Sequence, residues 1–168
     1  SGDGIERNKE EAARYYKKAA KKGDNEAMFN YAVMSSLGDG IPMNKKEAAF
    51  YYKISADLGN TDSMLNYGVM LEKGDGIQMN KKEAARYYKM SADKGNDSSM
   101  LNYGIMLNLG SGIEQNKKES ARYYKMSADK GNKIAMLNYA IMNLNGDGIP
   151  INKKESAKYM KMSADAGD

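Results

Sequence analysis

Apolar and small residues recur along this chain at helical spacing, in paired segments separated by glycine turns. In residues 63–71 they fall three and four positions apart, which predicts an amphipathic helix that ends before Gly74. Residues 84–92 have the same spacing and predict a second helix that ends before Gly95. The pattern therefore predicts two helices joined by a turn.

Glycines and polar residues mark the ends of these helices. Gly74-Asp75-Gly76 predicts the turn, because glycine tolerates a positive φ. Asn80 stands before the second helix and Glu83 follows three residues later, a spacing typical of a capping box. The end signals and the apolar pattern thus agree on where each helix lies.

The whole helix–turn–helix unit returns every 36 residues. The block of residues 60–68 recurs as residues 96–104 and 132–140. The recurring turn glycines are Gly2/Gly4, Gly38/Gly40, Gly74/Gly76, Gly110/Gly112 and Gly146/Gly148. A period of this length indicates units that bury their apolar faces only against their neighbours. We therefore predict an all-α fold, an α/α solenoid of helix–turn–helix repeats.

The repeat boundaries follow from the period. We expect one array over residues 1–168, with a leading half repeat 1–23 and four full repeats, 24–59, 60–95, 96–131 and 132–167, giving nine helices. The first helix, expected over residues 9–22, is a second helix without its partner. The array also closes directly after a second helix, without a polar cap, and such arrays usually need caps for solubility. We therefore expect the chain to be a segment of a longer protein.

Small residues predict how closely the helices approach. Ala32, Gly68, Gly104 and Ala140 occupy one position of the first helix, directly after a tyrosine. Glycine inside a helix costs roughly 1 kcal/mol relative to alanine, so its presence indicates a tight helix crossing. The tyrosines supply most of the buried area, and we expect their hydroxyls to find partners or to reach the rim.

The repeated unit resembles the Sel-1-like repeat family, a branch of the tetratricopeptide-like solenoids. The resemblance rests on small residues at Ala27, Gly68 and Gly104, on turns such as Gly74-Asp75-Gly76-Ile77, and on Glu83-Ala84-x-x-Tyr87-Tyr88-x-x-Ser91-Ala92-x-x-Gly95. It covers the whole chain and implies a right-handed solenoid that organises partner proteins without catalysis. One departure is regular: Tyr31, Tyr67, Tyr103 and Tyr139 stand where the family usually has leucine, as though an aromatic had moved by one turn.

One face of the first helices is a candidate contact surface. If Tyr67 points to the core, Leu65 and Val69 point almost directly away from it, with Asn66 beside them. In tetratricopeptide-like arrays the first helices line the concave wall. The candidate partner-binding residues are Phe29, Asn30, Val33, Leu65, Asn66, Val69, Leu101, Asn102, Ile105, Leu137, Asn138 and Ile141.

Two interpretations of this face stay open. The apolar pairs form a groove for a partner, or they pack between neighbouring repeats. The asparagines hold an extended peptide backbone, since an amide both donates and accepts, or they bond a nearby carbonyl of the chain itself. In the first case selectivity would come from positions that vary between copies, such as Leu37, Lys73, Leu109 and Asn145.

The amino-acid composition excludes several kinds of catalytic and metal-binding site. The chain has no cysteine and no histidine, which removes thiol nucleophiles, zinc–thiolate sites and the usual general base. We expect no catalytic residues, no metal and no cofactor, and hence no enzyme. A cysteine-rich bacterial branch of the family has been linked to enzyme-like activity, but this chain lacks the cysteines. Each Gly-Asp-Gly turn has a single carboxylate, which is too few for a calcium site. The turns also lack the preceding strand and the glycine spacing of phosphate-binding loops.

Charge and hydropathy bear on partners and location. No apolar run approaches the roughly 20 residues that cross a bilayer, and nothing resembles a signal peptide. We therefore expect no membrane association and favour an intracellular location. The net charge is +4, and lysine pairs such as Lys81/Lys82 recur along one edge. Glutamates alternate with these pairs, so we do not expect nucleic acid to be the main partner.

The sequence thus predicts a non-enzymatic scaffold that binds a peptide or a protein surface on its concave face. A different possibility is self-association, in which the uncapped last helix, with Met160 and Met162, stacks end to end on another copy's first helix. A basic surface that binds nucleic acid is a weaker alternative.

Overall fold

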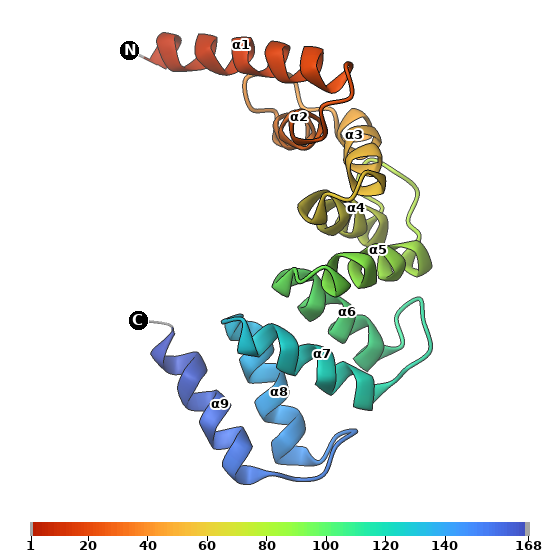
Figure 1. The fold of residues 1–168 in the computed structure, drawn as a ribbon, viewed down its shortest axis with the longest axis vertical. Helices are drawn as coiled ribbons and strands as arrows, with labels where there is room; N and C mark the ends of the chain where they lie inside the picture. The colour runs from red at the N-terminus through yellow and green to blue at the C-terminus, as the bar shows by residue number, and fades with distance from the viewer. Residues whose placement is uncertain (1, 167–168) are drawn as a thin grey trace. The chain divides into compact units, whose positions relative to one another are not determined.

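A computed structural model describes residues 2–166, with side chains from Asn8 onward, and this part of the chain contains helices and no strands (Figure 1). The helices are α1 (Gly2–Ala20), α2 (Asn25–Leu37), α3 (Lys45–Asp57), α4 (Thr61–Lys73), α5 (Lys81–Asp93), α6 (Asp97–Leu109), α7 (Lys117–Asp129), α8 (Lys133–Asn145) and α9 (Lys153–Asp165). We call α2, α4, α6 and α8 the first helices, and α1, α3, α5, α7 and α9 the second helices. The expected all-α class and the nine helices are confirmed for the described residues.

The first helices begin and end at the predicted residues. At α4, the Asn60 side chain accepts a hydrogen bond from the Ser63 backbone N–H at 2.8 Å. Gly74 ends this helix with φ 70° and donates its N–H to the carbonyl of Met70. The other first helices have an equivalent asparagine or aspartate at their start and a left-handed glycine at their end.

The second helices α3, α7 and α9 begin in the same way at an asparagine. Asn44, Asn116 and Asn152 each accept a hydrogen bond from the backbone N–H three residues later, at 3.0 Å. The residue at that later position is a glutamate in each case, which confirms the predicted capping spacing.

The structure consists of two compact units, residues up to Asn80 and residues from Lys81. In the N-terminal unit α1 packs on α2, α2 on α3 and α3 on α4. Its core contains tyrosines and alanines, with the Tyr31 ring edge-on to Tyr51 at 5.1 Å between centroids. Ser63 and Ser55 join α4 to α3 by a buried hydrogen bond of 2.7 Å between their hydroxyls.

In the C-terminal unit each helix from α5 to α9 also packs on the next one along the chain. Tyr103 lies edge-on to Tyr123 and Tyr139 lies edge-on to Tyr159, at 4.8 and 4.9 Å between ring centroids. These contacts, together with Tyr31 on Tyr51, explain the tyrosines that depart from the family pattern. In these three repeats the first-helix tyrosine lies edge-on to the first of the two aromatic positions of its second helix.

The Gly-Asp-Gly turns approach the second helix of the preceding repeat. A Cβ on Gly76 would lie 2.8 Å from the Lys45 carbonyl carbon, so only glycine fits here. The neighbouring Asp75 accepts from the Lys45 ammonium at 2.7 Å. Lys117 and Asp147 form the same pair at 2.7 Å. The turn therefore fastens one repeat to the previous one.

The start of the chain differs from the prediction. We expected a turn at Gly2/Gly4 and a helix over residues 9–22, but the backbone is helical from Gly2 to Ala20. The later turns are fixed by two neighbours, a first helix that ends at the leading glycine and a second helix that receives the trailing one. Neither of these two neighbours of Gly2 and Gly4 is present among the described residues.

Candidate functional site

The twelve predicted contact residues lie on the four first helices but differ in exposure. Most are half-buried: Phe29, Asn30, Val33, Leu65, Asn66, Val69, Asn102, Ile105 and Asn138. Leu137 and Ile141 are exposed, at 45% and 49%, whereas Leu101 is only 7% exposed. Side chains at the same position of different repeats therefore differ in how exposed they are.

In the N-terminal unit, Asn66 and Val69 line an open hollow between α4 and the preceding repeat. Leu37, which is 70% exposed, and Tyr52 lie on the opposite side, and the cavity measures about 240 Å³. The ion pair of Lys45 and Asp75 also belongs to its wall. The hollow thus combines an apolar side chain, a primary amide and a paired charge, which suits the backbone and side chains of a peptide.

The Asn66 side chain is partly used by its own helix. Its amide nitrogen donates to the carbonyl of Asp62 at 2.9 Å. A primary amide has two N–H donors and an acceptor oxygen, so this bond uses one donor. The residue as a whole is one of those that line the hollow. This is the local arrangement that a peptide-binding role would need.

In the C-terminal unit the apolar pair of α6 takes part in packing between repeats. Leu101 belongs to a buried cluster with Tyr124 of its own repeat and with Met136 and Ala140 of α8. Ile105 packs against the same cluster. Leu101 therefore serves the core, while Leu137 and Ile141, one repeat later, stay exposed because no further helix covers them within the described residues.

Charged residues near the ends of the second helices form a network that joins successive repeats. Lys89 pairs with Asp93 at 2.6 Å, and the Tyr123 hydroxyl, 30 residues further on, donates to the same carboxylate at 3.1 Å. In the next repeat Lys125 pairs with Asp129 at 2.6 Å, and the Tyr159 hydroxyl donates to Asp129. The hydroxyls thus find partners, and aspartate near a helix C-terminus is explained by this contact.

The Tyr159 phenol is strongly perturbed by this environment. Burial first, and then the hydrogen bond that it donates to the Asp129 carboxylate, together raise its pKa to about 12. The folded pKa therefore lies above the ordinary value of about 10. The stability that this phenol contributes is complete below about pH 10 and is lost as the pH rises through about 12.

We expect Tyr159→Phe to lower the free energy of unfolding by about 0.5–1.5 kcal/mol near neutral pH, because one hydrogen bond is lost. Between about pH 10 and 12 the variant should lose less stability than the parent, since its ring does not ionise. Urea denaturation followed by circular dichroism across this range measures both effects. Parallel curves for the two proteins would show that Tyr159 does not couple ionisation to folding.

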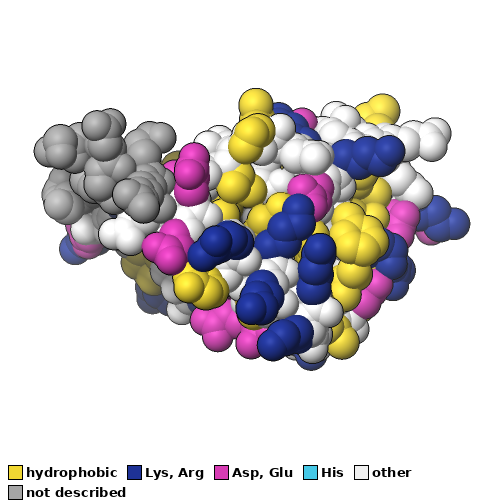
Figure 2. Space-filling model, turned by 90° about the horizontal axis from the view of Figure 1, so that it is seen from above, with side chains coloured by type: hydrophobic (Ala, Val, Ile, Leu, Met, Phe, Trp, Pro, Cys, Tyr) yellow, Lys and Arg dark blue, Asp and Glu magenta, His cyan; other side chains and the backbone are white. Residues whose placement is uncertain are grey.

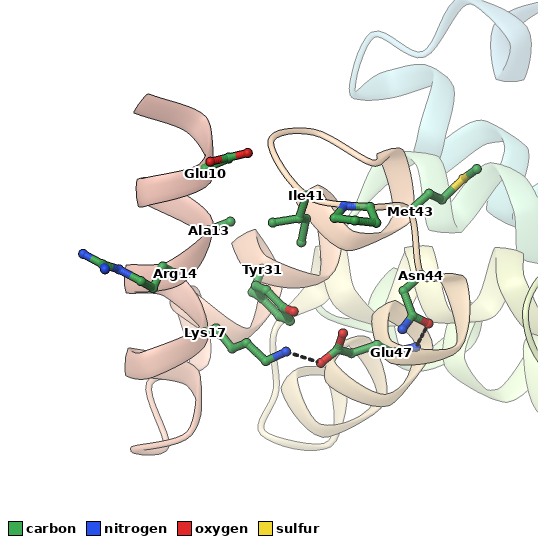
Figure 3. A pocket seen from close by; sticks show the side chains of 10 residues that line it. Glu10, Ala13, Arg14, Lys17, Tyr31, Ile41, Met43, Asn44 and Glu47 are labelled. Carbon is green, nitrogen blue, oxygen red and sulfur yellow. Dashed lines mark hydrogen bonds and ion pairs between the residues drawn. The ribbon is translucent and has the colours of Figure 1, made fainter. Parts of the chain in front are cut away.

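The first repeat junction lacks this aspartate and uses a different pair. Lys21 stands where Asp57 and Asp93 stand in later copies. Lys17 instead bonds Glu47 at 2.7 Å, with its ammonium 5.0 Å from the centre of the Tyr31 ring (Figure 3). The hydrogen bond to Glu47 is the main cause that holds the Lys17 pKa well above its ordinary value. The pair borders a cavity of about 450 Å³.

Neither a membrane segment nor a metal site emerges from the described residues. No helix there is both long and apolar enough to span a bilayer. No three or more His, Cys, Asp and Glu side chains of the described part come together as they would around a metal ion.

The sequence matches a profile described as the Sel1 repeat over five segments, residues 1–24, 25–60, 61–96, 97–132 and 133–168. A comparison with curated proteins finds no match.

Solved structures give similar folds. A protective antigen of uropathogenic Escherichia coli, described as having an SLR fold, is 31% identical, with a TM-score of 0.90 over 93% of this chain and 33% of that one. A Sel1 repeat protein from Oxalobacter formigenes is 30% identical, with a TM-score of 0.89 over 95% of this chain and 65% of that one. Helicobacter pylori cysteine-rich protein B is 20% identical with a TM-score of 0.62, over 80% of this chain and 97% of that one. The chain thus spans about a third of the length of the Escherichia coli antigen and about two thirds of the length of the Oxalobacter formigenes protein.

Proposed function

This chain belongs to the Sel1 repeat family, and we propose that it is a non-enzymatic scaffold that binds a peptide or a protein surface through its first helices. The observation that carries the proposal is the hollow beside Asn66 and Val69, which joins apolar, amide and charged groups in one open site. Exposed leucine beside it adds contact area, since Leu37 is 70% exposed. No thiol or imidazole is available for catalysis.

The proposed contact surface varies along the chain in a way that suits selectivity. The position of Leu37 is taken by Lys73, Leu109 and Asn145 in later copies, while the asparagine equivalent to Asn66 is the same in every copy. We infer that the asparagines hold the partner's backbone and that the variable positions read its side chains. The buried Leu101 is left out of this surface.

A nucleic-acid role gains no support from the lysines. Lys9, Lys45 and Lys117, the first lysines of the recurring edge, pair with Asp39, Asp75 and Asp147 at 2.6–2.7 Å. A lysine that is already paired releases fewer counterions on binding a phosphate backbone. The edge is therefore better suited to holding repeats together than to binding phosphates.

The proposal predicts that binding depends on the hollow in the N-terminal unit. Peptides selected from a displayed library for binding to the parent chain should bind the double variant Asn66→Ala, Val69→Asp at least about tenfold more weakly, a change of about 1.4 kcal/mol. Calorimetry or fluorescence anisotropy with a labelled peptide measures the affinity.

Phe50→Asp is the matched control, because Phe50 is an exposed apolar residue of the same unit, on α3 and outside the hollow. Its affinity should equal that of the parent, with circular dichroism confirming helicity for all proteins. A double variant that binds as the parent does, or a Phe50→Asp variant that alone loses binding, would refute a contact surface on the first helices.

A further inference from the structure

The turn between α6 and α7 has a serine where the other turns have an aspartate. Its sequence is Gly110-Ser111-Gly112. The turns that follow α2, α4 and α8 have Asp39, Asp75 and Asp147 at the middle position. Each of these aspartates pairs with the lysine 30 residues earlier, at 2.6–2.7 Å. The lysine at that distance from Ser111 is Lys81, the first residue of α5, and it forms no ion pair within the described residues.

The backbone of this turn is the same as that of its counterparts. The Ser111 N–H donates to the carbonyl five residues earlier at 3.0 Å, as the Asp147 N–H does in its own turn at 3.1 Å. A Cβ on Gly112 would lie 2.6 Å from the carbonyl carbon of Lys81, and the same approach to the preceding second helix is 2.6 Å at Gly148. The Ser111 side chain therefore starts from the position, relative to Lys81, that an aspartate has relative to its lysine elsewhere.

Ser111 is also the most accessible serine of the described chain. Ser36 and Ser98 are half-buried like Ser111, but they lie within α2 and α6, and the other described serines are buried. Residues 110–116 lie between α6 and α7 and form no helix. Surface loops of this kind are where an enzyme can reach a side chain. Ser111 therefore combines an accessible hydroxyl with a nearby cation.

The charges near this turn and over the surface suit an added phosphate. Glu114 is exposed and lies three residues after Ser111, so it can mark the serine for a kinase that recognises an acidic residue at that distance. Lysine and arginine together outnumber aspartate and glutamate, 26 to 22. Figure 2 shows Lys and Arg side chains lying beside one another on one face, with acidic side chains at intervals. A phosphate therefore reduces the excess of positive charge.

We propose that Ser111 is a phosphorylation site and that Lys81 binds the phosphate, which then fastens this turn to α5 as an aspartate fastens the other turns. A phosphoserine carries a charge of about −1.5 to −2 and three acceptor oxygens. These oxygens lie one bond further from Cβ than those of an aspartate, so they can reach the ammonium. The site is separate from the Asn66 hollow and does not depend on the function proposed there.

The modification is a phosphoryl transfer from a nucleoside triphosphate that a serine kinase binds. The Ser111 hydroxyl oxygen forms a bond to the terminal phosphorus, and the bond from that phosphorus to the bridging oxygen breaks. The nucleoside diphosphate leaves, and the hydroxyl proton passes to a base of the kinase.

The first test asks whether the folded chain is modified at Ser111. The chain is incubated with ATP and a serine kinase that prefers an acidic residue three positions after the serine, and mass spectrometry locates the phosphate. We expect Ser111 to react at least about tenfold faster than Ser98, which lies in α6 and has Leu101 at the same distance. Absence of phosphate from Ser111, or faster reaction of Ser98, would overturn the proposal.

The second test asks whether Lys81 holds the phosphate. Urea denaturation compares chains with serine or phosphoserine at position 111, in the parent and in Lys81→Gln. The phosphate should lower the equilibrium constant for unfolding by about fivefold in the parent, and by less than about twofold in Lys81→Gln.

Lys82→Gln is the matched control, because Lys82 is the neighbouring residue and is also exposed, while the lysines at its position in the other repeats do not pair with a turn aspartate. The phosphate should stabilise this variant as it stabilises the parent. An equal effect of the phosphate in the parent and in Lys81→Gln would contradict the proposed contact, and so would an effect that only Lys82→Gln removes.

Discussion

Replacing Gly112 with alanine is expected to lower the free energy of unfolding of the C-terminal unit by about 2–5 kcal/mol. Gly112 has φ +74°, a conformation that costs an L-residue about 1–2 kcal/mol. In addition, the new Cβ would lie 2.6 Å from the carbonyl carbon of Lys81, and backbone cannot move aside as a flexible side chain does. Such overpacking adds about 1–3 kcal/mol.

Gly131→Ala separates the two causes. Gly131 has φ +99°, but nothing lies within 4 Å of the position that its Cβ would take. Gly131→Ala should therefore lower the free energy of unfolding only by the cost of the backbone conformation, about 1–2 kcal/mol. Urea denaturation followed by circular dichroism gives both values. If Gly112→Ala were no more destabilising than Gly131→Ala, the close approach of the turn to the preceding second helix would be wrong.

The second large effect is expected for Leu101→Asp. Leu101 lies in the buried cluster with Tyr124, Met136 and Ala140, so an aspartate there would be a charge without a partner in the core. Loss of the leucine side chain and burial of the charge together should lower the free energy of unfolding by at least about 3 kcal/mol. The thermal midpoint of the chain measures the change.

Leu137→Asp is the matched control, because Leu137 holds the same position one repeat later and is 45% exposed. We expect its effect on stability to be below about 1 kcal/mol. Equal destabilisation by the two substitutions would mean that Leu137 is covered in solution. A small effect of Leu101→Asp would mean that the leucine position faces solvent in every repeat.

Much of the fold follows from local signals in the sequence. Asn60 and Gly74 bound a first helix, and Asn44 with Glu47 begins a second one, as the hydrogen bonds show. These predictions succeed because a cap involves only residues within one turn of each other. The 36-residue period then repeats the result down the chain.

Features that depend on residues one repeat apart were harder to predict. Lys45 and Asp75, or Asp93 and Tyr123, are 30 residues apart, and no helical spacing connects them. The sequence showed glutamates alternating with the lysine pairs, but only the packing of the turn on the preceding helix shows that Lys45 and Lys117 pair with the aspartates of the next turns. The 36-residue period alone does not show which residues of successive repeats contact each other.

The candidate contact surface shows the same limit. Leu101 and Leu137 stand in the same place of the same motif, yet one is in the core and the other is exposed. What differs is the neighbour: helix α8 packs beside Leu101, while no helix of the described chain follows α9. A repeated residue therefore indicates a position in the unit, and its exposure depends on whether the next unit is present.

The most direct measurement for the proposed contact surface is the footprint of a library-selected peptide on the ¹⁵N-labelled chain. We predict that the side-chain amide signals of Asn66 and the methyl signals of Val69 shift with the backbone amides around them, in proportion to bound peptide. Shifts confined to the outer side of α3, around Phe50 and Ile54, would contradict the account.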